Sequence, residues 1–185
     1  MNNHAAGKYT GFAMLLHWLI AVLVIVSWRI AEGAEGAATR EARGEIMANH
    51  FALGVVIFTV VAVRLIWRQM NPPPPAPAGH KGWERTLARI VHTAFYVLLL
   101  AMPIAGWIAM SSFGSQISVW GLFELPRLPV PINQALGEQI FELHALAGTT
   151  LLILIVVHAL GALKHTLIDK DGTLFRMLPF GRVRG

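Results

Sequence analysis

Four long apolar runs constrain the fold of this 185-residue chain more than any other feature of its sequence. They cover residues 12–30, 47–68, 87–110 and 141–163. A helix of about 20 residues crosses the roughly 30 Å hydrocarbon core of a bilayer, and it satisfies its backbone groups within the segment. Because 55% of the residues are hydrophobic and 14% are charged, we expect an all-α membrane protein. The expected architecture is one domain over residues 1–185, in which four transmembrane helices form a bundle enclosing two cofactors.

The distribution of charge predicts how these helices are oriented. Lys and Arg are in excess at both ends of the chain and around residues 69–86, whereas the connections after the first and third runs hold more Glu than Arg. By the positive-inside rule, both termini and the 69–86 connection are expected in the cytoplasm. The sequence pI of about 10.2 is then a signal of topology, and nucleic acid is not expected as a partner.

The fourth run carries two histidines, His144 and His158, at a spacing that suits a cofactor-binding helix. Fourteen residues fall about 40° short of four full turns and rise about 21 Å, so both imidazoles point the same way from opposite halves of the helix. Ionisable side chains at membrane depth are costly, and they mark functional sites. The alternative is a pair of core histidines bonded to neighbouring carbonyls.

Two further histidines can face this pair. In the predicted orientation, His17 lies in the cytoplasmic half of the first helix and can face His158, while His50 lies near the outer end of the second and can face His144. Two facing pairs at two depths are the arrangement that holds two b-type haems in a four-helix bundle. The chain has no Cys, which excludes thioether attachment and iron–sulfur clusters held by this chain. Two haem b groups are therefore expected to bind noncovalently, through iron.

Glycines support this arrangement. Three of them follow a candidate ligand by three or four residues and share its helix face. They are Gly54, Gly148 and Gly161. A missing side chain there leaves room for a flat macrocycle, and the alternative is ordinary small-residue packing between membrane helices.

Other side chains are expected near the cytoplasmic haem. His92, in the third helix, could replace His17 or His158 as a ligand, and it is otherwise expected to bond a haem propionate or a helix carbonyl. Arg64 could pair with a propionate, because a guanidinium matches a carboxylate in two parallel hydrogen bonds. The alternative is snorkelling to lipid phosphates, which we expect for Arg68.

The connections are expected to differ in kind. Residues 71–78 (NPPPPAPA) should form an extended spacer without a chemical role. His4 and His80 fall in segments predicted to be exposed, and no role is expected for them. The long connection 111–138 mixes apolar residues with prolines, which predicts a structured cover over the mouth of the bundle.

Several short patterns are similar to those of one known family. They are the His17–Trp18 pair, the NHFALG stretch from Asn49 to Gly54, the His92…Tyr96…Met102-Pro103…Gly106-Trp107 pattern, and His144 with His158. Through them nearly the whole chain resembles the bacterial cytochrome b561 family. The resemblance implies a diheme cytochrome of the bacterial inner membrane that exchanges electrons with the quinone pool. The implied haem ligands are His17, His50, His144 and His158.

The resemblance also bears on the electron donor and acceptor. Some relatives are similar to superoxide oxidases, which implies that the chain is an oxidoreductase. Its implied partners are superoxide as electron donor, ubiquinone as electron acceptor and the membrane lipids around it. His165 becomes the leading quinone-site residue. It lies seven residues beyond His158, on the same helix face and about 10 Å nearer the cytoplasm. The competing interpretation is an interfacial histidine that meets lipid head groups. The net negative outer face opposes strong attraction of an anionic donor.

Two other functions remain open at this point. The chain could be the cytochrome b subunit of a hydrogenase or dehydrogenase complex, with a redox partner docked at the outer face. It could instead be a haem-free four-helix transporter that uses its buried histidines as a proton relay. A purified haem protein is red, whereas such a transporter is colourless.

Overall fold

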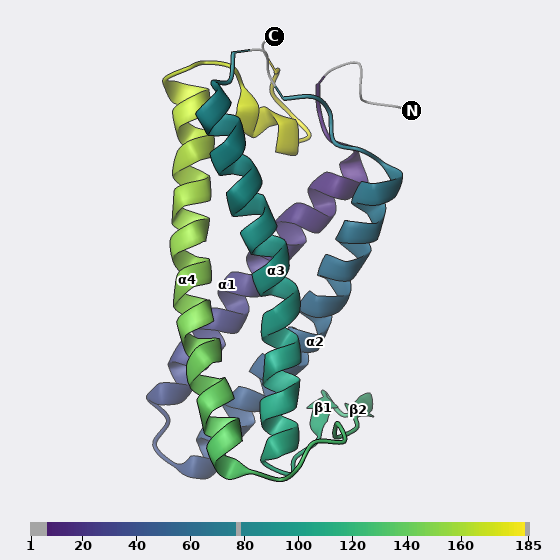
Figure 1. Cartoon of the computed structure of the whole chain (residues 1–185), viewed down its shortest axis with the longest axis vertical. Helices are drawn as coiled ribbons and strands as arrows, with labels where there is room; N and C mark the ends of the chain where they lie inside the picture. The colour runs from purple at the N-terminus through teal and green to yellow at the C-terminus, as the bar shows by residue number, and fades with distance from the viewer. Residues whose placement is uncertain (1–6, 77–78, 184–185) are drawn as a thin grey trace.

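Four long helices account for most of the computed structural model, which describes residues 7–76 and 79–183 (Figure 1). They are α1 (Gly11–Glu35), α2 (Arg40–Met70), α3 (Gly82–Ser112) and α4 (Gln134–Leu167). Each is long and apolar enough to cross a membrane. The predicted all-α fold with four membrane-spanning helices is therefore confirmed. His4 lies outside the described residues.

The helices extend beyond the apolar runs of the sequence. α2 begins at Arg40 and α4 at Gln134, each about two turns earlier than the hydropathy pattern predicts. Side chains cap both starts, because Thr39 and Asn133 each accept a backbone N–H three residues further on, at 3.1 Å. Hydropathy reports the part of a helix that lies in lipid, so these polar first turns could not be predicted from it.

The helices form two antiparallel pairs that pack into one bundle. α1 packs mainly against α2, and α3 mainly against α4. The two pairs meet in an apolar core at mid-length, made of Ile20, Val24, Ile57, Val61 and Leu151. Many large apolar side chains elsewhere on the helices are exposed, as expected for a surface that faces lipid.

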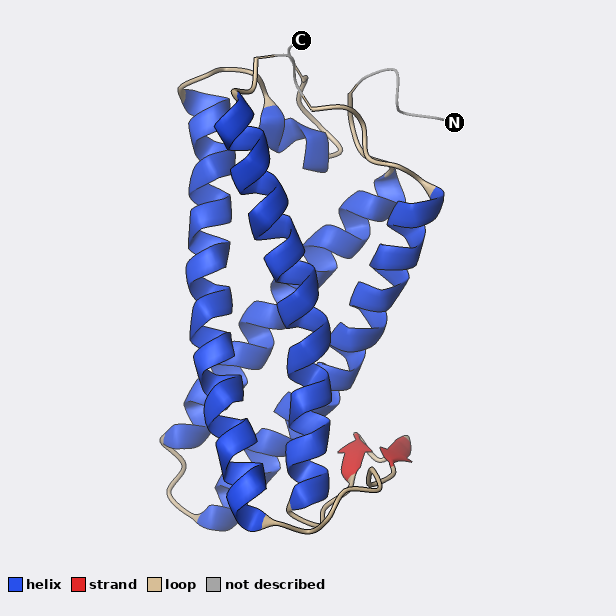
Figure 2. Cartoon of the chain, in the orientation of Figure 1, coloured by secondary structure: helices blue, strands red, loops and turns tan. Residues whose placement is uncertain are grey.

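The two ends of the bundle are built differently (Figures 1 and 2). A small β-hairpin of β1 (Ile117–Val119) and β2 (Phe123–Leu125) lies at the end where α4 begins, which we call the hairpin end. Its turn residues Trp120 and Gly121 have positive φ, and the Trp120 indole donates a hydrogen bond to the Asn49 side chain at 3.0 Å. The long connection is thus an ordered element tied to α2.

The opposite end, where α1 begins and α4 ends, is the terminal end. Here Arg176, from the short 3-10 helix η2 (Thr173–Met177), is buried. Its guanidinium donates to the carbonyls of Pro74 at 2.9 Å, Pro75 at 2.7 Å and Gly7 at 2.9 Å. Three segments that are distant in sequence are joined by one side chain. The proline-rich connection, interpreted from sequence as a spacer without a role, is therefore an anchored part of the structure.

Candidate functional site

Two pairs of histidines face each other inside the bundle, one near each end. At the hairpin end, the rings of His50 on α2 and His144 on α4 have centroids 6.0 Å apart and planes at 74°. Towards the terminal end, His17 on α1 and His158 on α4 have centroids 6.1 Å apart and planes at 72°. The structure thus brings together the two pairs predicted from sequence, with nearly the same geometry.

The spacing within each pair fits a metal ion held between two imidazoles. An ion at the midpoint would lie about 3 Å from each ring centre. This equals a metal–nitrogen bond of about 2.0 Å plus about 1 Å from the nitrogen to the centre of the ring. The stacked rings of His80 and His165, by contrast, lie 4.1 Å apart, which leaves no room for an ion between them. The residues present therefore fit an axially ligated haem iron at both positions.

Hydrogen bonds fix which nitrogen the hairpin-end histidines present. Nδ1 of His50 lies 3.0 Å from the carbonyl oxygen of Ser27, and Nδ1 of His144 lies 3.1 Å from that of Met102. A carbonyl oxygen only accepts, so Nδ1 of His144 carries the proton and its Nε2 keeps the lone pair. Nδ1 of His50 lies 3.0 Å from the Ser27 hydroxyl as well, and its contact with the carbonyl corresponds to the same tautomer. Metal-binding histidines are typically held in this way, with one nitrogen bonded to a carbonyl and the other directed at the metal.

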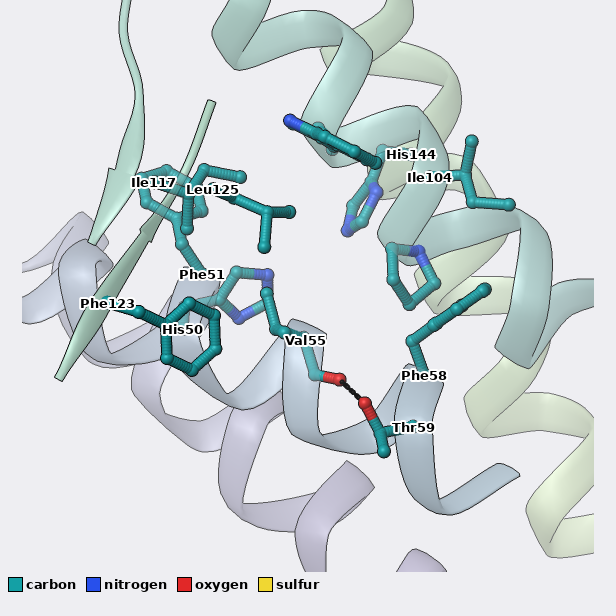
Figure 3. A pocket seen from close by; sticks show the side chains of 14 residues that line it. His50, Phe51, Val55, Phe58, Thr59, Ile104, Ile117, Phe123, Leu125 and His144 are labelled. Atoms are coloured by element: carbon teal, nitrogen blue, oxygen red, sulfur yellow. Dashed lines mark hydrogen bonds between the residues drawn. The ribbon is translucent and has the colours of Figure 1, made fainter. Parts of the chain in front are cut away.

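Two cavities adjoin the His50–His144 pair. One, of about 390 Å³, extends towards Phe58 and the β-hairpin, and Figure 3 shows His50 and His144 on opposite sides of it. The other, of about 430 Å³, extends between α1 and α4 and is lined by Trp28 and Gly148 among others. Both are lined mainly by apolar side chains. Both cavities have His50, Gly54 and His144 in their lining, so the space around the two imidazoles fits a flat macrocycle.

The glycines next to the ligand candidates leave this space open. A methyl group added at Gly54 or Gly161 would meet no atom within 4 Å, and one at Gly148 would meet only the end of Met102 at 3.7 Å. Sequence reasoning did not assign a site role to Gly106, which lines both cavities and lies against His144. Its position in the Gly106-Trp107 pattern was the signal that could have indicated this.

A third histidine lies beside the terminal-end pair. The ring of His92 on α3 is 5.4 Å from that of His158, edge to face, which is shorter than the separation within either facing pair. The His17–His158 separation matches the hairpin-end pair, so the geometry favours His17 over His92 as the partner of His158. The assignment of His92 as a neighbour of the haem stays a prediction.

The two arginines at the end of α2 have different surroundings. Arg64 of α2 donates a hydrogen bond to the carbonyl of Ala13, one turn before His17 on α1. Arg68 lies over the ring of Tyr96, 6.0 Å from its centroid. Arg64 is thus placed beside the candidate ligand and has further N–H donors for a propionate. Its pairing with haem stays a prediction.

His165 lies at the end of α4 and is not alone there. Its ring is stacked on that of His80, and its Nδ1 lies 3.0 Å from a carboxylate oxygen of Asp171. The expectation that His80 would be exposed is wrong, because the segment before α3 folds back against the segment after α4. No local pattern could predict a contact between residues so far apart in sequence.

A four-helix membrane bundle with two facing histidine pairs defines a class, the b-type cytochromes whose haems lie between transmembrane helices. Residues 8–180 match the family model described as prokaryotic cytochrome b561. The chain is 31% identical over 176 residues to cytochrome b561 homolog 2 of Escherichia coli K12, covering 92% of this chain and 91% of the relative. The chain belongs to the prokaryotic cytochrome b561 family, which implies a b-type haem.

Other relatives carry different names. A protein of Yersinia pestis named probable superoxide oxidase CybB is 31% identical over 172 residues, covering 93% of this chain and 96% of that protein. Cytochrome b562 of Cereibacter sphaeroides is 27% identical over 179 residues, covering 92% and 94% respectively. The similarity extends over nearly the full length in each case.

Proposed function

We propose that this protein is a diheme b-type cytochrome of the bacterial inner membrane that transfers electrons from superoxide at the outer face to ubiquinone. The observation that supports it most directly is the pair of matched histidine separations, 6.0 and 6.1 Å. The α4 members of the two pairs are 14 residues apart, which places the sites about 21 Å apart along the helix. Two haems at this spacing would let an electron cross the membrane in several short steps.

In this proposal His50 and His144 hold the outer haem, and His17 and His158 hold the inner one, with the hairpin end outside and the terminal end in the cytoplasm. When bound, haem b supplies a centre that accepts and releases one electron at a time. The chain's own residues fix the ligand orientation through Ser27, exclude water with an apolar lining and leave space beside the glycines. The apolar lining also favours a low dielectric around the iron, which tunes its potential.

The proposed quinone site lies at His165. The residue follows His158 by seven positions, on the same face of α4 and about 10 Å further along the helix. An imidazole there can donate a hydrogen bond to a quinone oxygen and supply a proton. Lys164 and Asp169 beside it form a salt bridge at 2.7 Å, so the site adjoins polar groups that hold water near the membrane surface.

Superoxide is proposed as the donor because a relative named probable superoxide oxidase covers nearly the whole chain. The cavity of about 430 Å³ at the hairpin end is lined by Arg43 together with Glu32 and Glu35. One guanidinium among carboxylates can admit a small anion but cannot attract it strongly. The proton-relay transporter considered from sequence would bind no haem, whereas the family to which the chain belongs implies a b-type haem.

The test is a purified protein followed by absorption spectroscopy. We expect two noncovalent haem b per chain, reduction by an enzymatic superoxide source that superoxide dismutase suppresses, and reoxidation by added ubiquinone. Replacing His165 with Ala should preserve both haem spectra and slow reoxidation by about tenfold. Reduction that is insensitive to superoxide dismutase would reject superoxide as the donor and favour a partner protein, as in the cytochrome b subunit alternative.

A further inference from the structure

A compact group of titratable side chains surrounds His165 at the terminal end. Nδ1 of His165 and Nε2 of His80 each lie 3.0 Å from the same oxygen, Oδ2, of Asp171. The other oxygen, Oδ1, accepts the backbone N–H of Thr173 at 2.8 Å. An ionised carboxylate only accepts hydrogen bonds, so both ring nitrogens donate to it. Nε2 is therefore the nitrogen of His165 that remains to act on a bound molecule.

The geometry of this group is that of a hydrogen-bonded network and differs from that of a metal site. The donor atoms of His80, His165 and Asp171 lie within 4.8 Å of one another, which is close enough for an ion by distance alone. The two imidazoles, however, are stacked with centroids 4.1 Å apart and planes at 25°. The point on which the two ring nitrogens converge is already occupied by Oδ2 of Asp171, which lies 3.0 Å from each of them. The group fits a hydrogen-bonded network built around a carboxylate.

The charges around the imidazoles favour a proton on one of them. Three carboxylates lie around the pair, from Glu84 on α3 and from Asp169 and Asp171 after α4, and the ammonium of Lys164 bridges the first two. This excess of negative charge favours a proton on one ring, whereas a proton on each ring would place two cations in stacked contact.

That single charge is better placed on His165 than on His80. Nδ1 of His165 lies 2.9 Å from Oδ2 of Asp169 as well as 3.0 Å from Asp171, whereas His80 contacts the Asp171 carboxylate alone. A buried carboxylate bonded to the Nδ1–H of a histidine also stabilises the imidazolium, as in other aspartate–histidine pairs. His80 holds the same carboxylate from its other side and covers one face of the His165 ring.

We infer that Asp171 and His80 are positioning residues that make His165 the proton donor for quinone reduction. The inference rests on the proposed function, because it takes His165 as the group that contacts the quinone. Each quinone consumes two electrons, delivered from the electron-transfer path, and two protons. For each proton, the Nε2–H bond of His165 breaks and an O–H bond forms on the quinone. His165 is left neutral with its Nδ1–H on Asp171, and Nε2 takes a new proton from cytoplasmic water.

The experiment measures the rate of haem reoxidation by a soluble ubiquinone analogue over about pH 6 to 9, with the complete haem-loaded protein. Asp171→Asn keeps the shape of the side chain but removes the charge that stabilises the imidazolium. We expect reoxidation about tenfold slower at the alkaline end and close to wild type at the acidic end, where the supply of protons does not limit the rate. The quinone concentration that gives half the maximal rate should be unchanged. A wild-type pH profile in Asp171→Asn would overturn the inference.

A second pair of variants tests the role of His80 even if Asp171→Asn fails to fold. His80→Gln keeps an N–H donor for Asp171, whereas His80→Ala removes it. We expect His80→Gln to retain the wild-type rate and His80→Ala to lose roughly threefold, the effect of a weakened orienting hydrogen bond. Equal rates in the two variants would reject a positioning role for His80. Arg85→Gln, at an exposed position one turn from the start of α3, is the matched control.

His165→Ala distinguishes failure of the proposed quinone site from failure of the proposed positioning residues. A slow His165→Ala together with a wild-type Asp171→Asn leaves the quinone site in place and rejects the positioning residues. Wild-type reoxidation in His165→Ala instead rejects the proposed quinone site itself, and the inference with it.

Discussion

The two ends of the bundle hold similar histidine pairs in different surroundings. At the hairpin end, His50 and His144 are oriented by backbone carbonyls of neighbouring helices and face apolar cavities. At the terminal end, the histidines of α4 are followed by carboxylates, a lysine and an arginine, which come from the ends of α3 and α4, from η2 and from the segment that joins α4 to η2. A backbone carbonyl fixes a ring without adding charge, which suits electron transfer. A carboxylate fixes a ring and also stabilises a proton on it, which suits a site where electrons and protons leave together.

The largest expected effect is on haem content, and it tests whether His50 and His144 hold the same haem. His144→Ala and His50→Ala should each lower the haem content from two to one per chain, because an axial ligand is lost in either case. The remaining haem should keep its spectrum, since its ligands lie about 21 Å away along α4. Haem content by the pyridine haemochrome method, with absorption spectra of both variants, provides the measurement. Two intact haems in either variant would show that the pairing is wrong.

The next effect distinguishes the ligands at the other pair. His17→Ala should lose the inner haem, whereas His92→Ala should retain both and shift a potential, because its ring lies beside His158 at 5.4 Å. Redox titration followed by absorbance measures both outcomes. Loss of a haem in His92→Ala, with full occupancy in His17→Ala, would exchange the roles of the two residues.

A smaller effect, on the free energy of unfolding, tests how much the buried Arg176 guanidinium stabilises the terminal end. Arg176→Met removes hydrogen bonds to three carbonyls and should lower the free energy of unfolding by about 2 kcal/mol. Thermal unfolding in detergent should show this loss, while haem content at room temperature stays unchanged. Arg182→Met, at an exposed position six residues further on, is the control and should unfold like the wild type.

The smallest effect concerns pH and the Asp171 carboxyl. Burial would raise the pKa of Asp171, but hydrogen bonds from Thr173 and His80 hold it below its ordinary value of 3.8. The ionised group therefore stabilises the folded state above that value, and the contribution is lost as the pH falls through the lowered pKa. The difference in melting temperature between wild type and Asp171→Asn should be present at pH 7 and shrink at about pH 3. A difference that stays constant with pH would mean that the charge of Asp171 does not contribute.

The sequence predicted the parts of the molecule that obey local periodicity. His144 and His158 could be placed on one helix face because 3.6 residues make a turn, and their partners followed from the alternating direction of the helices. The polar first turns of α2 and α4 could not be predicted, because hydropathy detects only the apolar part of a membrane helix. The contacts of Arg176 with Gly7 and of His80 with Asp171 join residues 169 and 91 positions apart, and no residue pattern encodes such pairings.

The division of the bundle into two helix pairs has a consequence for how the protein matures. α1 packs mainly on α2 and α3 on α4, while each proposed iron is held by one histidine from the first pair and one from the second. A haem held in this way would crosslink the two helical hairpins. Cofactor supply would then govern assembly, since the hairpins close on each other most firmly once both crosslinks are in place.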